Sequence, residues 1–411
     1  MAIDFEIPKD AKEVRERVRK WVHDECIPAE KKVTDKESFK SVLTSLRKKA
    51  REQGLWCPFI PKEHGGMALG PLANALVQME LGESYLGALS MNSQGPDDAT
   101  MLTLLAHGTD YQKEKFLKPL LNGDKRICYS MTEKAAGADA TGMQTRAVKK
   151  GNSAYVLNGE KWFSSAATSA DIALVMAKTN PDAPRHQQFS TFIVELPNPG
   201  YNIKRNIKTM AVEGPLSHIM GGGHAEIEIK DLEVPAENIL GGEGNGFNMG
   251  QHRLAYGRLR HGMHNVAMAQ RALDMAVKHV TNRTTFGKKL SERQGVQFML
   301  ADCASELYMA RLMLMHIAYK AEKGLDLRQE NSIAKVFLAH MVHKVVDTAI
   351  QLHGALGYSQ DTPLASWYTH IRSQRLVDGP DEVHRWTVGR NIIKAYEKFG
   401  TTASAAGGDL L

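Results

Sequence analysis

The 411-residue sequence predicts an α+β fold with an N-terminal helical domain, a middle β domain and a C-terminal domain built like a four-helix bundle. Two observations predict this fold. Apolar residues recur every three or four positions in the first and last thirds of the chain, a spacing typical of amphipathic helices. Between them the apolar period changes to two, which is typical of half-buried strands. We expect domains at residues 1–126, 127–237 and 238–400, followed by a disordered tail at 401–411.

The first domain begins with a helical pattern, because Val14, Val18 and Trp21 share one helical face. The glycine- and proline-containing segment 61–66 then interrupts the pattern and favours a turn-rich connection. In the middle domain, residues 225–229 alternate as in a half-buried strand. The dipeptide Asn158-Gly159 separates two further strand-like runs, and it predicts a hairpin turn.

The C-terminal domain is expected to contain three long amphipathic helices. Apolar residues repeat with helical spacing over 259–280 and again over 296–317, and a third helix is expected over 332–352. Long amphipathic helices with short connections indicate a helical bundle. The tail at 401–411 is rich in small residues and glycine, which favours disorder.

Composition narrows the function classes. A net charge of +6 with dispersed basic residues argues against nucleic-acid binding. No apolar run approaches the length of a membrane span. The four cysteines are far apart and form no metal-ligand pattern, which indicates a reducing compartment. The first residues do not resemble a secretory signal. We therefore expect a cytoplasmic protein, or a mitochondrial matrix protein if it is eukaryotic, although no transit peptide is visible.

Two distant segments carry the motifs. The first is Tyr129-Ser130-Met131-Thr132-Glu133, continuing to Gly137-Ala138-Asp139. The second opens with Gln351-Leu352-His353-Gly354-Ala355 and closes with Asp378-Gly379-Pro380-Asp381-Glu382-Val383-His384-Arg385. Their order and separation resemble the acyl-CoA dehydrogenase family almost end to end. The resemblance implies the fold of that family, bound FAD and an acyl-CoA substrate. It also implies an electron-transfer flavoprotein as the electron acceptor. The expected assembly is a homodimer, or a homotetramer made of two such dimers.

The resemblance also implies which residues of the middle domain bind FAD. A flavin edge has alternating donors and acceptors, which backbone amides and the Thr132 hydroxyl can match. Phe163 falls at an aromatic position beside the flavin and Ser165 at a hydroxyl position. An ordinary hairpin with a core aromatic residue would give the same pattern. The implied residues of this half are Tyr129, Met131, Thr132, Phe163, Ser164 and Ser165.

A second group of implied FAD residues belongs to the helical bundle. A guanidinium suits a pyrophosphate, and in the family the arginine matched by Arg283 reaches the FAD of a neighbouring subunit. An arginine at a helix end beside a glycine stop is the alternative interpretation. Glycine allows close backbone approach at Gly354, whereas His353 is interpreted as a packed or turn-bonded histidine. The implied residues are Arg283, Phe286, Gln294, Gln351, Gly354 and Ala355.

Asp378 is the expected catalytic base. The family's base is usually a glutamate seven residues before an arginine, and Arg385 gives Asp378 that offset. Counting forward from Pro363 reaches the same residue. A solvated turn would be the alternative. In the family the base removes the α-proton of the thioester while the flavin accepts the β-hydride.

The substrate residues implied by the resemblance are Ala138, Arg258 and Gly379. Ala138 replaces a serine that touches CoA in the family, and Arg258 matches an arginine near the base and the thioester, although a salt-bridged helix residue is an equal alternative. The segment Asp-Gly-Pro-Asp-Glu-Val-His, together with Thr369-His370 in place of an Arg-Asp pair, resembles a branch associated with 4-hydroxy acids processed as 4-phosphoacyl-CoAs. Rival hypotheses are a flavin oxidase or monooxygenase of the same fold, similar to nitroalkane oxidases, and a catalytically inactive scaffold.

Overall fold

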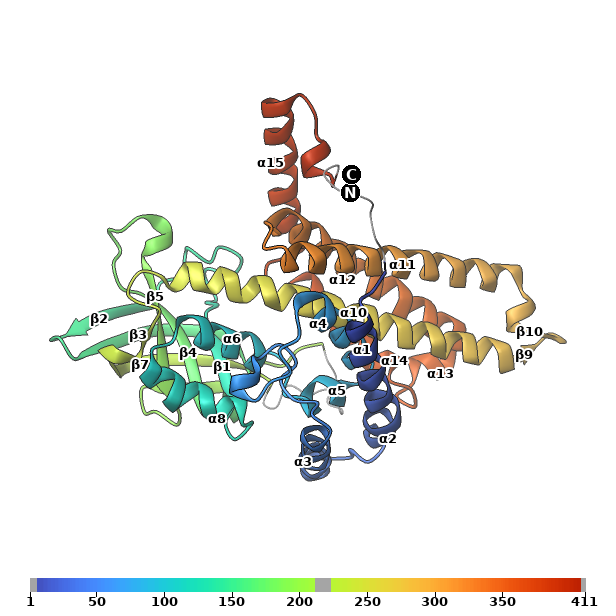
Figure 1. Ribbon diagram of the computed structural model, residues 1–411, viewed down its shortest axis with the longest axis horizontal. Helices are drawn as coiled ribbons and strands as arrows, with labels where there is room; N and C mark the ends of the chain where they lie inside the picture. Colours follow the sequence, from blue (N-terminus) through green and yellow to red (C-terminus); the bar gives the residue numbers. More distant parts are fainter. Residues whose placement is uncertain (1–5, 211–222, 408–411) are drawn as a thin grey trace.

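The computed structural model describes residues 6–210 and 223–407. A β domain lies at one end of the molecule and a helical bundle at the other, and the 37-residue helix α10 (Gly246–Asn282) runs between them (Figure 1). The predicted sequence of helical, β and helical parts is confirmed. Residues 1–5 belong to the start that is not expected to be a secretory signal, and they lie outside the described residues. The last four residues of the tail, 408–411, also lie outside them.

The N-terminal part is helical, and its helices pack on α10 and on the β domain. Its core contains Val18 and Trp21, with Val14 packed against them, so the helical face expected from the sequence is buried. Its helices are α1 (Lys9–Trp21), α2 (Ile27–Glu30), α3 (Lys36–Glu52), α4 (Pro71–Leu81), α5 (Tyr85–Ser90), α6 (Asp97–His107), α7 (Asp110–Gln112) and α8 (Lys118–Leu121), with π-helical turns at Val22–Cys26 and Lys113–Leu117.

The β domain is a sheet with the strand order β6-β7-β3-β2-β4-β5-β8, and β1 pairs in parallel with β4. Apolar side chains of β3, β4, β5 and β7 form its core. The strands are β1 (Ile127–Ser130), β2 (Arg146–Lys150), β3 (Ala154–Ser165), β4 (Ile172–Lys178), β5 (Phe189–Glu195), β6 (Tyr201–Asn206), β7 (His224–Pro235) and β8 (Ile239–Leu240).

The hairpin expected at Asn158-Gly159 is wrong. Strand β3 continues through this dipeptide, and its pairing with β7 shifts register there. Gly159 is needed for close approach, because a Cβ atom would lie 2.5 Å from Thr145 Oγ1. Asn158 instead accepts a 2.8 Å hydrogen bond from the Asp231 amide of β7. The dipeptide therefore forms a bulge that bends a long central strand, a role that glycine also serves.

The C-terminal part contains the three expected long helices, α10, α11 (Gln294–Glu322) and α12 (Arg328–His353). Together with part of α4 they enclose the largest apolar core. A small hairpin, β9 (Thr284–Thr285) and β10 (Lys288–Lys289), joins α10 to α11 at the end of the molecule far from the β domain (Figure 1). The remaining helices are α13 (Ala355–Tyr358), α14 (Leu364–Ile371) and α15 (Asp381–Phe399).

Part of the tail expected to be disordered has defined structure. Residues Ala403–Ala405 form a 3-10 helix. The Ala405 side chain is buried, and its carbonyl accepts a 2.7 Å hydrogen bond from Gln329 of α12. A small side chain and one backbone contact are enough to dock this turn, and neither is visible in a composition.

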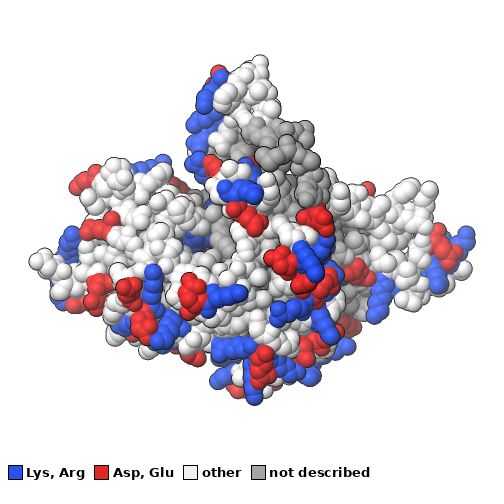
Figure 2. Space-filling view, in the orientation of Figure 1, with Lys and Arg blue, Asp and Glu red and all other residues white. Residues whose placement is uncertain are grey.

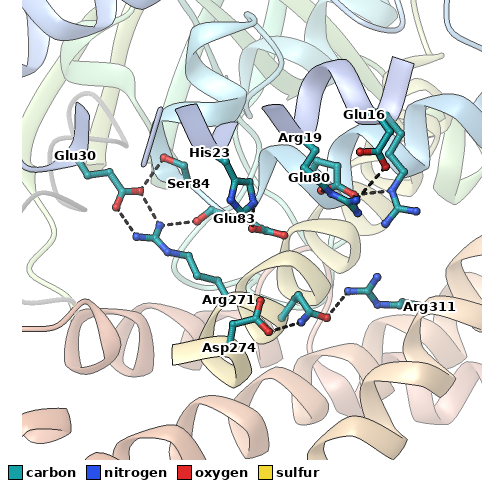
Figure 3. Close-up of polar contacts among 12 residues, drawn as sticks. Glu16, Arg19, His23, Glu30, Glu80, Glu83, Ser84, Arg271, Asp274 and Arg311 are labelled. Atoms are coloured by element: carbon teal, nitrogen blue, oxygen red, sulfur yellow. Dashed lines mark hydrogen bonds and ion pairs between the residues drawn. The ribbon is translucent and has the colours of Figure 1, made fainter. Parts of the chain in front are cut away.

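Polar contacts hold the N-terminal helices against α10 (Figure 3). Arg271 of α10 donates to both carboxylate oxygens of Glu30, at 2.9 and 2.8 Å, and to the Glu83 carbonyl at 2.6 Å. The buried Glu80 carboxylate accepts from Arg15 and Arg19 of α1. Two-pronged arginine–carboxylate contacts fix orientation as well as distance. They fix the N-terminal part on the helix that also carries Arg258.

On the face shown in Figure 2, acidic and basic side chains are interspersed over most of the surface, while basic side chains follow one edge of the projecting helix α15. Among the described residues, no helix combines the length and apolar character needed to cross a bilayer.

Candidate active site

A buried ion pair shapes the segment that follows β1. Lys161 Nζ of β3 lies 2.8 Å from Glu133 Oε1, and both side chains are almost completely buried. Lys161 also donates to the Met131 carbonyl at 3.0 Å, while Glu133 accepts from the amides of Gln144 and Thr145. Burial lowers the pKa of Lys161 to about 8, an effect that Glu133 partly offsets. These contacts fix the backbone of Met131 and Thr132.

Strand β3 presents the second piece of this half. Phe163 has a left-handed backbone (φ 54°) and an exposed ring, which lies 5.3 Å from the His224 ring. Ser165 Oγ lies 2.8 Å from His224 Nδ1. Burial, with a smaller contribution from His370, lowers the pKa of His224. The Ser164 hydroxyl turns into the core and contacts Ser130 Oγ at 2.8 Å, which leaves only its backbone toward the predicted flavin site.

Two buried polar atoms of the β domain are available to hydrogen-bond a ligand. The Tyr129 hydroxyl and the Trp162 indole nitrogen are buried without a hydrogen-bond partner in the described part of the chain. Arg253 lies over the Tyr129 ring at 4.1 Å. Buried polar groups normally have partners. Unpaired donors, an exposed aromatic ring and a backbone held by Lys161 at Met131 fit a flat heteroaromatic cofactor such as the flavin of FAD.

Asp378 lies in a turn held against α10. Its backbone is left-handed (φ 53°), and its carbonyl accepts a 2.7 Å hydrogen bond from Arg258 Nε. The carboxylate lies against the helix at Gly257, where a Cβ atom would be 3.0 Å from Asp378 Oδ2. His261 Nε2 lies 3.7 Å from the same oxygen. The structure therefore brings together three predicted residues, Asp378, Gly379 and Arg258.

A small cavity opens beside Asp378, and charged, amide and apolar residues line it together. Arg258 and Lys335 supply positive charge, and burial lowers the pKa of both groups. Asp378 is the single acid in the lining. Within the described residues the cavity is lined by Arg258, His261, Gly262, Asn265, Lys335, Leu338, Gln374, Val377 and Asp378. Ala138, by contrast, lies exposed in the turn after Glu133 and does not contact this cavity.

The predicted cofactor residues of the bundle form a separate group, and all of them are exposed. Arg283 follows the end of α10, and Phe286, which is 98% exposed, lies in the β9–β10 turn. His279 and His353 stack at 4.4 Å, which brings the α10–α11 connection close to the α12–α13 turn. The members of this group are Arg283, Phe286, Gln294, Gln351, Gly354 and Ala355. As expected, His353 is packed and bonded to its own helix, at 2.7 Å from the Ala349 carbonyl.

The two groups of cofactor residues do not meet in one chain. Gly250 of α10 is next to Tyr129, and Arg283 follows the other end of the same helix. At 1.5 Å per residue, 33 residues of helix correspond to about 50 Å. Figure 1 shows the β domain and the β9–β10 hairpin at opposite ends of the molecule.

Several residues of the site could not be predicted from the sequence. His224, His261, Lys335 and His384 enter it from β7, α10, α12 and α15. A histidine or lysine at a helical position does not reveal which partner it meets. Of these four residues only His384 belongs to a motif, the segment 378–385, and that motif did not indicate a role for it.

Known proteins were compared with the chain. Three family models match it: the N-terminal domain of acyl-CoA dehydrogenase over residues 8–124, the middle domain over 128–221 and the C-terminal domain over 244–393. Acyl-CoA dehydrogenase family member 11 of Gallus gallus is 37% identical over 398 residues, which are 93% of this chain and 50% of that protein. This chain therefore spans about half the length of that relative.

Two bacterial relatives match over most of their length. FadE2 of Mycobacterium tuberculosis, named as an acyl-CoA dehydrogenase, is 37% identical over 356 residues, which are 85% of each chain. A solved structure described as an acyl-CoA dehydrogenase from Mycobacterium abscessus is 32% identical, with a TM-score of 0.89 over 95% of this chain and all of that one. The chain belongs to the acyl-CoA dehydrogenase family, a family of FAD-dependent oxidoreductases.

Proposed function

We propose that this protein dehydrogenates an acyl-CoA thioester between its α and β carbons, with Asp378 as the base. The observation that carries the proposal is the placement of the Asp378 carboxylate in the lining of an interior cavity, with its backbone fixed by Arg258. FAD, when bound, would accept the hydride from the β carbon. An Asp378 oxygen would take the α-proton, which leaves the carboxyl neutral until it releases that proton to solvent.

The residues of the β domain would orient the flavin. The Met131-Thr132 backbone is held by the Lys161–Glu133 pair, and Phe163 offers an exposed aromatic face. Ser165 has its hydroxyl oriented by His224. Tyr129 contributes a buried hydroxyl that needs a partner.

A second copy of the chain would complete the cofactor site. The separation of about 50 Å along α10 supports this, because one FAD cannot contact both groups. The exposed group around Arg283 would bind the pyrophosphate and adenine end of the FAD held by the partner. We therefore propose a homodimer, or a dimer of such dimers.

The substrate is proposed to carry a hydroxyl or phosphoryl group at carbon four. An alkyl chain favours an apolar channel, yet the cavity beside Asp378 contains Arg258, Lys335, Asn265 and Gln374. Arg258 donates to the Asp378 carbonyl, and the Asn265 and Gln374 amides line the same cavity. Guanidinium and amide groups favour an anionic or hydrogen-bonding substituent on the substrate.

Electrons are proposed to leave through an electron-transfer flavoprotein, and the protein is proposed to act in a reducing compartment such as the cytoplasm. All four cysteines are unpaired and buried, which fits such a compartment.

The test of the base is Asp378→Asn, which keeps the size of the side chain and removes its basicity. Flavin reduction by substrate, followed anaerobically by rapid mixing, should slow by at least about 10²–10⁴-fold while FAD stays bound. Asp378→Glu should also lose activity, because the carboxylate already lies close to α10 at Gly257. Reduction of Asp378→Asn at the wild-type rate would reject the proposal. Rapid peroxide formation in air by the wild type would instead identify an oxidase.

The substrate class is tested with a panel of CoA esters and a dye acceptor. We expect a higher kcat/KM for a 4-phosphoryl or 4-hydroxy ester than for butyryl-CoA or octanoyl-CoA. Gln374→Met should reduce that preference, since it removes a hydrogen-bonding amide from the cavity lining. A preference for either unsubstituted ester would contradict the assignment but leave the dehydrogenation itself intact.

A further inference from the structure

The backbone of Asp378 adopts a conformation that its residue type disfavours. Its φ of 53° lies in the left-handed region, which costs free energy for a residue with a Cβ atom. Such a conformation persists only when the surroundings fix it. The contacts to the Asp378 carbonyl identify what fixes it here.

Two side chains converge on this carbonyl. Arg258 Nε donates to it at 2.7 Å from α10, and His384 Nε2 of α15 lies 3.2 Å from it on another side. His384 is buried, and burial lowers its pKa to about 4, so the ring is neutral and carries one N–H. Because a carbonyl only accepts, that N–H is on Nε2. Nδ1 lies 3.3 Å from Ser332 Oγ of α12, whose hydroxyl also donates to the Arg328 carbonyl at 3.0 Å.

Gly379 makes room for this arrangement. A Cβ atom there would lie 2.8 Å from His384 Nε2, and its φ is 98°. A glycine after the base therefore permits both the turn and the close approach of the histidine ring. The Asp-Gly pair and the histidine six positions after the aspartate act as one unit.

Asp381 anchors the far side of the same turn. Its buried carboxylate accepts from Arg375 Nε at 2.9 Å and lies 2.9 Å from His340 Nε2 and 3.3 Å from Lys335 Nζ. Burial alone would raise its pKa, but these partners outweigh burial and lower it. Asp381 thus ties the start of α15 to α12 and to the segment before Asp378.

We propose that His384 and Asp381 are positioning residues for the base: His384 holds the Asp378 carbonyl so that its carboxylate is aimed into the cavity, and Asp381 fixes the turn on α12. The inference rests on the proposed role of Asp378 and assigns a task to the rest of the Asp-Gly-Pro-Asp-Glu-Val-His segment. Neither residue lines the cavity, so both act through Asp378.

The histidine is tested with three variants that separate shape from hydrogen bonding. A glutamine can place an N–H where His384 Nε2 is, an asparagine places it near Nδ1, and a leucine places none. Displacement of a reacting group by ~1 Å costs about 100-fold in rate. His384→Leu and His384→Asn should therefore slow flavin reduction about 10–100-fold, and His384→Gln should recover most of the rate. Binding of an unreactive CoA thioether should change little in all three.

A readout without turnover accompanies the kinetics. Hydrogen exchange of the amides in 376–384, measured before substrate is added, should quicken in His384→Leu and in Asp381→Asn and stay near wild type in His384→Gln. His23→Leu is the control. His23 pairs with Glu83 in the N-terminal part, far in the sequence from residues 376–384, so the substitution should change neither measurement.

The outcomes distinguish this inference from the proposed function. If Asp378→Asn is inactive while His384→Leu and His384→Asn reduce flavin at the wild-type rate, the positioning role is wrong and the base assignment stands. If Asp378→Asn is active, the base assignment itself is wrong. Should His384→Leu fail to fold, equal rates for the glutamine and asparagine variants would overturn the positioning role.

Discussion

The two groups of predicted cofactor residues differ in how the chain prepares them. In the β domain, Met131 and Thr132 are fixed by a buried ion pair, and Ser165 is bonded to His224. In the bundle, Arg283, Phe286 and Gln351 are exposed, and among the described residues Arg283 forms no ion pair. The fold of the single chain fixes the β-domain group in place, whereas the bundle group lies exposed at the surface.

This difference explains how one site can be divided between copies of a chain. Groups that must be precise before a partner arrives are fixed by burial, and burial needs a folded domain around them. Groups that complete a neighbour's site must instead stay accessible at a surface. The long helix α10 connects the two and sets their separation.

The largest loss of stability should come from disrupting the buried ion pair that fixes the β-domain group. Lys161→Met leaves the Glu133 carboxylate buried without its cation, and loss of one partner of a buried pair costs about 3–5 kcal/mol. Urea unfolding should show that loss, together with release of FAD. Lys150→Met, which breaks an exposed pair with Glu233, is the control and should cost less than about 1 kcal/mol. Equal losses of unfolding free energy in the two variants would contradict the idea that buried contacts fix the β-domain group.

Arg283→Ala should have a smaller effect, and of a different kind. A hydrogen bond to a charged group contributes about 1.5–3 kcal/mol, so FAD should bind roughly 10–150-fold more weakly. The exposed position predicts little change in the unfolding of the chain itself, but a looser dimer by light scattering. Lys288→Ala, in the same hairpin, is the matched control. A flavin-saturated monomer would contradict the division of the site between two copies.

Low pH should lower the free energy of unfolding through the buried histidines. The pKa of His384 is lowered to about 4 in the folded protein, against ~6.5 when exposed. Between those values the unfolded chain binds the proton and the folded chain does not, so stability falls as the pH falls. His384 alone should remove roughly 2 kcal/mol at pH 5. Burial lowers the pKa of His224, His261, His264 and His370 in the same direction.

Urea unfolding at pH 5, 6 and 7 measures this slope. His384→Gln, which cannot titrate, should flatten it by the share that His384 contributes. A free energy of unfolding that is constant from pH 7 to pH 5 would show that these rings are not held neutral.

Much of the architecture could be predicted from the sequence, because it follows from local periodicity. The long helices at 259–280 and 296–317 lie inside α10 and α11, since an apolar stripe repeated over many turns has one structural solution. Asn158-Gly159 failed as a hairpin signal because turn chemistry is shared with bulges, and only pairing with β7 distinguishes the two. The docked turn at Ala403–Ala405 depends on a contact with α12 that no local pattern contains.

For the site, the sequence by itself determined which residue types occur in which order: an aspartate seven residues before Arg385, and an arginine just after the longest helix. Tertiary structure alone decided what those residues meet. It turned the Ser164 side chain into the core and left Ala138 in an exposed turn. It also brought Arg258 and His384, which are more than a hundred positions apart in the sequence, to one carbonyl. The physical reason is that order along a chain is covalent, whereas burial and partners depend on packing between distant elements.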